Sequence, residues 1–301
     1  MTQKGYTKAE LLSAGLVVQN KNGRLYDKFR NRLMLPVVDT RGDVVAFGSR
    51  VLDKSEPKYM NSSETPVYSK RRVLYGLNLA KKSKRPNIIL CEGNLDIVTL
   101  HQAGFDNAVA SMGTALTPEQ IRLLSRFTKE LVLCYDNDNA GKIATERALQ
   151  LLNGSEFSVK VLQLPRRRTG DGELVKQDAD DFIKNQGPAA FERLLSGSEN
   201  GVEFRMAQVA GKYDLDSDEQ RVAYSQEISE LLASLPGAVE REISAARAAE
   251  TARITPDAMK LEVQRAWKRK AARENRAELR KELNPAVQSQ PQERALRYEN
   301  V

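Results

Sequence analysis

The chain has 301 residues and a formal net charge of +7, and a chain of this length is expected to fold as two or three packed units. No apolar run approaches the ~20 residues that span a bilayer, and the N-terminus lacks the apolar core of a secretory signal, so a protein that is neither membrane-spanning nor secreted is expected. Two cysteines and one histidine are too few for a four-ligand zinc site, and buried thiols suit a cytoplasmic location.

Residues 1–86 form the first predicted segment, a basic subdomain rich in strands. A short helix is expected from Thr7 to Ala14, and residues 24–53 show the alternation of a β-meander. Residues 21–85 hold sixteen Lys or Arg against six Asp or Glu. This excess predicts a surface for a polyanion, although a solvated basic surface would have the same composition.

Residues 87–190 alternate between strand and helix patterns in the order β-α-β-α-β-α-β. The predicted strands are the segments NIILC, NAVAS, LVLCY and FSVKVLQLP. Such an alternation predicts a parallel sheet flanked by helices, so the fold class is α/β. Residues 191–283 are expected to form a C-terminal helical subdomain, which makes the whole chain α+β, and residues 284–301 a flexible tail.

Acidic residues follow three of the predicted strands. They are Glu92, the pair Asp136 and Asp138, and the cluster Asp178, Asp180 and Asp181. Because the carboxyl ends of parallel strands share one edge of a sheet, these acids are expected to converge on a hard cation such as Mg²⁺. One Asp-x-Asp alone would more often be a helix N-cap, but Glu is a poor cap, and the three groups together favour a metal site.

These segments resemble a known pattern, the Toprim motif set. EGNLDIV resembles the primase motif EGYMDV, CYDNDNAGKIA resembles FDGDxAGxxA, and DADDFI resembles DPDEFI. Upstream, YDKFRNRLMLPVVDTRGDVVAFGSRVL and PKYMNSSETPVYSK are similar to the basic segments of the same enzymes. The chain therefore resembles the RNA polymerase domain of bacterial DnaG-type primases, closely over residues 24–190 and as a helical region over 200–282. The pattern differs at Asn94, where an aromatic residue is usual, and at Asn137, where glycine is usual and asparagine tolerates a left-handed backbone.

The resemblance implies a Toprim sheet and metal-dependent synthesis of short RNA primers on single-stranded DNA. The implied metal is Mg²⁺ or Mn²⁺, and the implied ligands are Glu92, Asp136, Asp138, Asp178 and Asp180. The resemblance also implies that Lys58 is a catalytic residue, together with Glu92, Asp136 and Asp138. The implied nucleotide contacts are Arg50, Lys58, Asn61, Lys70, Gly93 and Asp96. The implied DNA contacts are Arg30, Arg32, Arg50 and Tyr59.

Two of these assignments have physical arguments of their own. Arg30 and Arg32 are expected two apart in a strand, so that both face one side and contact template phosphates. Asp96 is expected in the first turn of a helix, where it orients the nucleotide or a metal-bound water, or only complements the helix dipole.

The expected partners are single-stranded DNA, NTPs, the RNA primer and a replicative helicase. The zinc-binding module of these primases is expected to be absent. The helicase-binding domain is expected to be absent too, unless residues 202–283 contain part of one, and these helices are expected to end the polymerase domain. A monomer in the bacterial cytoplasm, associated with the nucleoid and free of the membrane, is expected. A non-catalytic DNA-binding Toprim protein, a Toprim nuclease and a topoisomerase fragment are the alternatives.

Overall fold

The computed structural model describes residues 2–169 and 171–283. The chain divides into two compact units at the boundary between Arg205 and Met206. The predicted tail, residues 284–301, lies outside the described residues. In the described part of the chain, no helix is long and apolar enough to cross a membrane.

The N-terminal part of the first unit is rich in short strands, as predicted. Its elements are η1 Thr2–Lys4, α1 Lys8–Ser13, β1 Val17–Gln19, β2 Leu25–Asp27, β3 Arg32–Val38, β4 Val44–Val51, β5 Tyr59–Asn61 and α2 Leu77–Ala80. Helix α1 begins after Thr7, whose side chain accepts a hydrogen bond from the N–H of Glu10 at 3.2 Å. Strands β3, β4 and β5 form an antiparallel sheet in that order.

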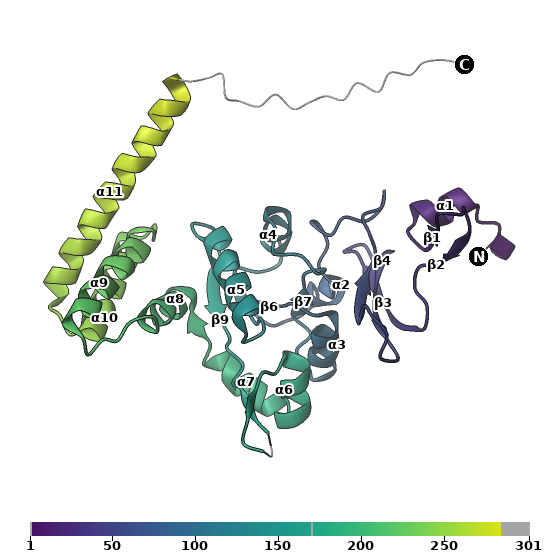
Figure 1. Ribbon diagram of the computed structural model, residues 1–301, viewed down its shortest axis with the longest axis horizontal. Helices are drawn as coiled ribbons and strands as arrows, with labels where there is room; N and C mark the ends of the chain where they lie inside the picture. Colours follow the sequence, from purple (N-terminus) through teal and green to yellow (C-terminus); the bar gives the residue numbers. More distant parts are fainter. Residues whose placement is uncertain (1, 170, 284–301) are drawn as a thin grey trace. The chain divides into compact units, whose positions relative to one another are not determined.

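A five-stranded sheet with the order β12-β9-β8-β6-β7 forms the centre of the first unit (Figure 1). The strands are β6 Asn87–Cys91, β7 Ala108–Ala110, β8 Glu130–Leu133, β9 Ser158–Val161 and β12 Glu199–Asn200. Strands β6 to β9 are parallel, which confirms the predicted α/β class. Strand β12, which the sequence pattern does not indicate, pairs antiparallel with β9 at the edge.

Helices cover both faces of this sheet because its strands are apolar on both sides. They are α3 Asn94–Gln102, α4 Pro118–Leu124, α5 Asn139–Leu152, α6 Ala179–Gln186 and α7 Pro188–Ser196. Along β6, Ile88 and Leu90 belong to the core that contains Leu149 of α5, whereas Ile89 belongs to the core that contains Phe182 of α6. Successive residues of one strand therefore supply two different cores, as the period of two requires.

A cluster of polar side chains, here called the polar clasp, ties the amino ends of the strands together. It consists of Asn87, Asn107, Glu130 and Lys160. The amide of Asn107 donates to the backbone oxygen of Asn87 at 2.9 Å, and the amide of Asn87 donates to Glu130 at 3.1 Å. Lys160 reaches the same carboxylate at 3.2 Å. The clasp lies at the end of the sheet opposite to the acidic residues.

Two further segments of this unit have regular structure. The charged segment after β9 contains a hairpin of β10 Arg167–Arg168 and β11 Leu174–Val175. The residues after Asp178 form two helices, because Gly187 has φ of 80° and Pro188 starts the second one.

Beyond Gly201 the described chain is helical, as predicted. The helices are α8 Gly201–Ala210, α9 Asp218–Ala233, α10 Ala238–Ala252 and α11 Pro256–Leu283. A break that includes Pro236 and Gly237 separates α9 from α10. Helices α9, α10 and α11 pack on one another, with Tyr224, Ile228 and Ala248 almost fully buried.

The turn from β8 into α5 depends on Gly141. Its N–H donates to the carboxylate of Asp138 at 2.9 Å, and an added Cβ would lie 1.9 Å from the backbone oxygen of Asp136. We expect Gly141→Ala to lower the free energy of unfolding by about 2–3 kcal/mol, measured by urea denaturation, because the backbone would have to move. This loss opposes the gain of ~1 kcal/mol that alanine usually brings to a helix.

Gly197→Ala is the matched control. Its φ is −94° and the nearest atom would lie 3.5 Å from the added Cβ, so we expect little change in stability. Equal unfolding free energies for the two variants would contradict the proposed role of Gly141.

Candidate active site

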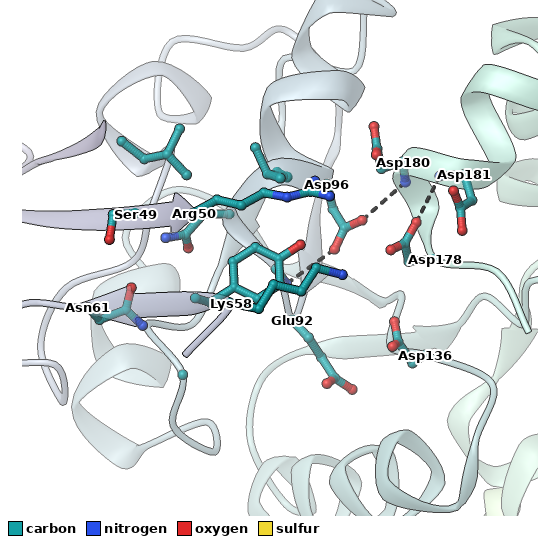
Figure 2. A pocket seen from close by; sticks show the side chains of 16 residues that line it. Ser49, Arg50, Lys58, Asn61, Glu92, Asp96, Asp136, Asp178, Asp180 and Asp181 are labelled. Carbon is teal, nitrogen blue, oxygen red and sulfur yellow. Dashed lines mark hydrogen bonds between the residues drawn. The ribbon is translucent and has the colours of Figure 1, made fainter. Parts of the chain in front are cut away.

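A pocket of about 390 Å³ lies between the antiparallel sheet and the carboxyl edge of the parallel sheet (Figure 2). The antiparallel sheet contributes Leu35, Ser49, Arg50, Lys58, Tyr59 and Asn61. The other walls contain Glu92, Gly93, Asn94, Leu95, Asp96, Gly113, Asp136, Asp178, Asp180 and Asp181. One wall is therefore basic and the facing walls are acidic.

The basic wall is organised around the ring of Tyr59. Arg50 pairs with Tyr59 in neighbouring strands, and its guanidinium carbon lies 5.7 Å from the ring centroid. The ammonium of Lys58 lies 5.4 Å from the same centroid. Both distances allow cation–π attraction, and the ring itself is 51% exposed. The amide of Asn61 donates to the backbone oxygen of Met112 at 3.4 Å, which holds β5 against the loop that follows β7.

Asp96 is the most buried acid of the pocket, with 7% of its surface exposed. Its carboxylate accepts hydrogen bonds from the N–H of Gly93 at 3.2 Å and of Asp180 at 3.1 Å. Burial, followed by the charge of Asp178, raises its pKa to about 7. Asp96 therefore joins the start of α3 to the start of α6.

The acids at the start of α6 form a compact cluster. One carboxylate oxygen from each of Asp178, Asp180 and Asp181 lies within 4.8 Å of the others. Asp178 caps the helix by accepting from the N–H of Asp181 at 2.8 Å, and Asp180 is paired with Lys184 at 2.6 Å. Carboxylate oxygens at such separations can hold a divalent cation. Of the three, the sequence assigns a metal-ligand role only to Asp178 and Asp180.

Asp136 and Asp138 follow β8 and share one cationic neighbour, Lys176. The ammonium lies 2.8 Å from the carboxylate of Asp138 and 3.9 Å from that of Asp136. The hydrogen bond from Lys176 lowers the pKa of Asp138, whereas burial raises the pKa of Asp136 despite the same ammonium. Asp138 also caps α5 by accepting a hydrogen bond from the N–H of Gly141. The N-cap that the sequence analysis gives as the alternative to a metal ligand is therefore present at this residue, which also lies beside Asp136.

Glu92 reaches the pocket from the end of β6. The pKa of this carboxyl is raised, first by the loss of water around it and then by the charge of Asp136. Glu92, Asp96 and Asp136 all have raised pKa values, first because burial disfavours their charged forms and then because other carboxylates lie near them.

Most of the predicted site residues meet in this pocket. The structure brings together Arg50, Lys58, Tyr59, Asn61, Glu92, Gly93, Asp96, Asp136, Asp178 and Asp180. Asp138 lies next to Asp136 through Lys176 but does not line the pocket, and neither do Arg30, Arg32 and Lys70. Lys176 is not among the predicted site residues, because its partner Asp138 lies 38 residues away in the chain.

The argument that placed Arg30 and Arg32 on one side of a strand is wrong. Strand β3 begins at Arg32, and Asn31 between the two arginines has φ of 50°, so strand alternation does not hold. Arg32 donates to the backbone oxygen of Pro57 at 2.8 Å, whereas the guanidinium of Arg30 lies 5.0 Å from the ring centroid of Tyr26.

The two departures from the expected motifs have local explanations. Among the described non-glycine residues, positive φ occurs at Asn31 and Arg253, so Asn137 does not use the left-handed backbone that asparagine tolerates. The amide of Asn137 instead donates to the backbone oxygen of Leu164 at 3.0 Å, which links the ends of two strands. Asn94 packs against Gly48, where an added Cβ would lie 2.5 Å from the Asn94 amide nitrogen.

Comparison with family models identifies three matching segments. A model described as the N-terminal domain of the DNA primase catalytic core matches residues 1–81, and a Toprim-like model matches residues 89–183. A model described as the DnaB-helicase binding domain of primase matches residues 202–257. The expectation that no helicase-binding domain is present is therefore wrong. The helices carry no local motif that would distinguish such a domain from the end of a polymerase domain.

Individual proteins give the same result. The chain is 42% identical to the DNA primase of Clostridium acetobutylicum over 244 residues, which is 81% of this chain and 39% of that protein. It therefore spans about two fifths of the length of this relative. The solved E. coli primase catalytic core is 34% identical with a TM-score of 0.70, and the match covers 84% of this chain and 81% of that one. A solved DnaG primase catalytic domain bound to ssDNA is 33% identical with a TM-score of 0.70, covering 83% and 80%.

The match to the E. coli catalytic core covers more of this chain than residues 1–205 alone could supply. It must therefore extend into the helices that follow. These helices thus share features with solved catalytic cores as well as with the helicase-binding model.

Lys176 neutralises the carboxylates that a cation would need. We expect Lys176→Gln to tighten Mn²⁺ binding about two- to fivefold, because the cation would no longer displace an exposed ion pair. Titration calorimetry measures this affinity directly. Lys160→Gln removes a comparable pair with Glu130 in the polar clasp and should leave Mn²⁺ binding unchanged. Weaker or unchanged Mn²⁺ affinity in Lys176→Gln would contradict the competition between lysine and metal.

Asp96 should make stability depend on pH. Between pH of about 4 and 7 the folded protein keeps a proton on this carboxyl that the unfolded chain has released, so the free energy of unfolding falls as pH rises. We expect Asp96→Asn to flatten this part of the profile in metal-free buffer, by at most about 1.4 kcal/mol per pH unit. Urea denaturation at several pH values gives the slope.

Asp138→Asn is the control with the opposite sign. Because the pKa of Asp138 is lowered, its stabilisation is present above the ordinary pKa and is lost only as pH falls through the lowered one. Asp138→Asn should therefore keep the wild-type slope near neutral pH. If Asp96→Asn also kept the wild-type slope, groups other than Asp96 would cause the pH dependence of stability.

Proposed function

The chain belongs to the bacterial DnaG primase family, and we propose that it synthesises short RNA primers on single-stranded DNA from nucleoside triphosphates. The observation that carries this proposal is the pocket in which Arg50 and Lys58 face Glu92 and Asp136. Basic side chains suit a triphosphate, and clustered carboxylates suit divalent cations. Nucleotidyl transfer needs both in one place.

We propose Mg²⁺ or Mn²⁺ as the cofactor. The acids of the pocket offer carboxylate oxygens, the type of ligand that hard cations prefer. The proposed ligands are Glu92, Asp136, Asp138, Asp178, Asp180 and Asp181. The raised pKa values of three acids in the pocket agree with this assignment, because a bound cation would stabilise the charged forms that burial and the neighbouring carboxylates disfavour. When bound, such a cation lowers the pKa of an attacking hydroxyl and stabilises charge on the departing pyrophosphate.

In the proposed reaction, the 3′-oxygen of the primer bonds to the α-phosphorus of the NTP, and the bond from this phosphorus to the pyrophosphate oxygen breaks. Arg50 and Lys58 hold the triphosphate, and the exposed ring of Tyr59 offers a stacking surface for a base. Asn61 orients the incoming nucleotide. Asp96 acts as a positioning residue, because its hydrogen bonds hold the backbone that carries Gly93 and Asp180.

The remaining partners follow from the same proposal. Arg30, Arg32 and Lys70 lie outside the pocket, and we assign them to the phosphates of the single-stranded template. A relative with 33% identity was solved with ssDNA, which supports this partner. The match at residues 202–257 supports a replicative helicase as a further partner. A monomer associated with the nucleoid remains our prediction for this chain.

Asp136→Asn tests the proposal. We expect synthesis of labelled primers on a single-stranded template, with Mg²⁺ or Mn²⁺, to fall about 10²-fold or more, because the amide no longer carries the charge that holds the cation. Asp171→Asn, in the exposed turn between β10 and β11, should keep wild-type activity. Circular dichroism checks that both variants fold. Wild-type activity in Asp136→Asn would remove this acid from the site, and inactive wild-type protein would overturn the proposed function.

A further inference from the structure

A second cavity of about 410 Å³ adjoins the first one. Glu92 and Gly113 line both cavities, so they form the boundary between them. The remaining lining comes from the loop between β7 and α4, which includes Leu116, and from the face of α5 that carries Ile143 and Arg147. Both volumes lie in the range of ~300–1,000 Å³ that ligand pockets usually have.

The chemistry of the second cavity differs from that of the first. Apart from Glu92 at the boundary, its charged lining residue is Arg147, and most of the lining is small or apolar, as at Leu116, Ile143 and Ala144. Such walls suit a base and a ribose. They lack the paired basic groups, Arg50 and Lys58, with which the first cavity would hold a triphosphate.

Nucleotidyl transfer requires two nucleotides at one set of metal ligands. The α-phosphate of one and the 3′-hydroxyl of the other must both reach the acids, and a single pocket cannot hold both nucleotides in the same place. The basic wall assigns the triphosphate to the first cavity. The hydroxyl must then approach from another direction, and Glu92 is the acid that faces both cavities.

We propose that the second cavity binds the 3′-terminal nucleoside of the growing RNA primer. Ile143 and Leu116 contact its base or ribose, and the exposed Arg147 lies where the next phosphate of the primer would leave the cavity. The 3′-hydroxyl then lies at Glu92, next to the incoming nucleotide. This inference rests on the proposed function and assigns a separate subsite to its second substrate.

Ile143→Trp tests the subsite. Ile143 is 53% exposed, so the larger side chain can fill the mouth of the cavity without disturbing a core. We expect the KM for a short RNA primer annealed to its template to rise at least about tenfold. The KM for the NTP and the Mg²⁺-dependent binding of a fluorescent NTP analogue should change less than about twofold, since they report the first cavity.

Leu151→Trp is the matched control. Leu151 lies on the same helix, is 39% exposed and lines neither cavity, so this variant should keep both KM values. Arg147→Ala is a second test in case Ile143→Trp fails to fold. It truncates an exposed side chain, and it should also raise the KM for the primer and reduce its dependence on salt.

The outcomes separate the subsite from the function. If the wild type extends primers, and both Ile143→Trp and Arg147→Ala behave like the Leu151→Trp control, the subsite is wrong and primer synthesis stands. If these variants raise the KM for the NTP instead, the second cavity belongs to the incoming nucleotide and our assignment is overturned. If the wild type extends no primer, the proposed function itself fails.

Discussion

Repulsion among carboxylates is the constraint on which this site depends, because closely spaced acids cannot all be ionised without nearby positive charge. The structure relieves it locally in three ways. Backbone N–H groups at helix starts bond to Asp138 and Asp178, the ammonium of Lys176 pairs with Asp138, and Asp96 has a pKa near neutral pH. Burial, and after it the neighbouring carboxylates, keeps the pKa values of Glu92 and Asp136 raised. In the function that we propose, divalent cations and the basic wall supply the positive charge that stabilises these carboxylates.

The basic wall can neutralise the carboxylates only if it is held over them. Two contacts within the first unit help to hold it there. The backbone of Tyr75 pairs with Ala110, with hydrogen bonds of 2.8 and 3.0 Å, which adds the end of the N-terminal region to the edge of β7. The amide of Asn61 bonds to Met112 in the next loop. Both anchors lie within three residues of one another on the β7 segment. This short stretch of chain therefore provides two of the contacts that hold the basic wall near the acidic walls.

Site residues can be predicted from the sequence where a pattern along the chain determines a position in space. Parallel strands place their carboxyl ends together, so the acids after NIILC and LVLCY could be assigned to one edge without coordinates. Prediction fails where the outcome depends on one dihedral angle or one distant partner. Asn31 takes a positive φ that no periodic pattern reveals, and Lys176 finds Asp138 across 38 residues. Strand β12 has two residues and exists only because β9 offers an edge.

The polar clasp has a consequence for how such a protein can change over evolutionary time. Its side chains link neighbouring strands near the end of the sheet that lies opposite to the acidic residues. The residues of the polar clasp are thus different from the acidic residues at the carboxyl ends of the strands. A lineage could exchange a residue at the acidic edge, as asparagine replaces the customary glycine at Asn137, and retain the scaffold that positions the others. A substitution at the acidic edge therefore leaves the contacts of the polar clasp intact.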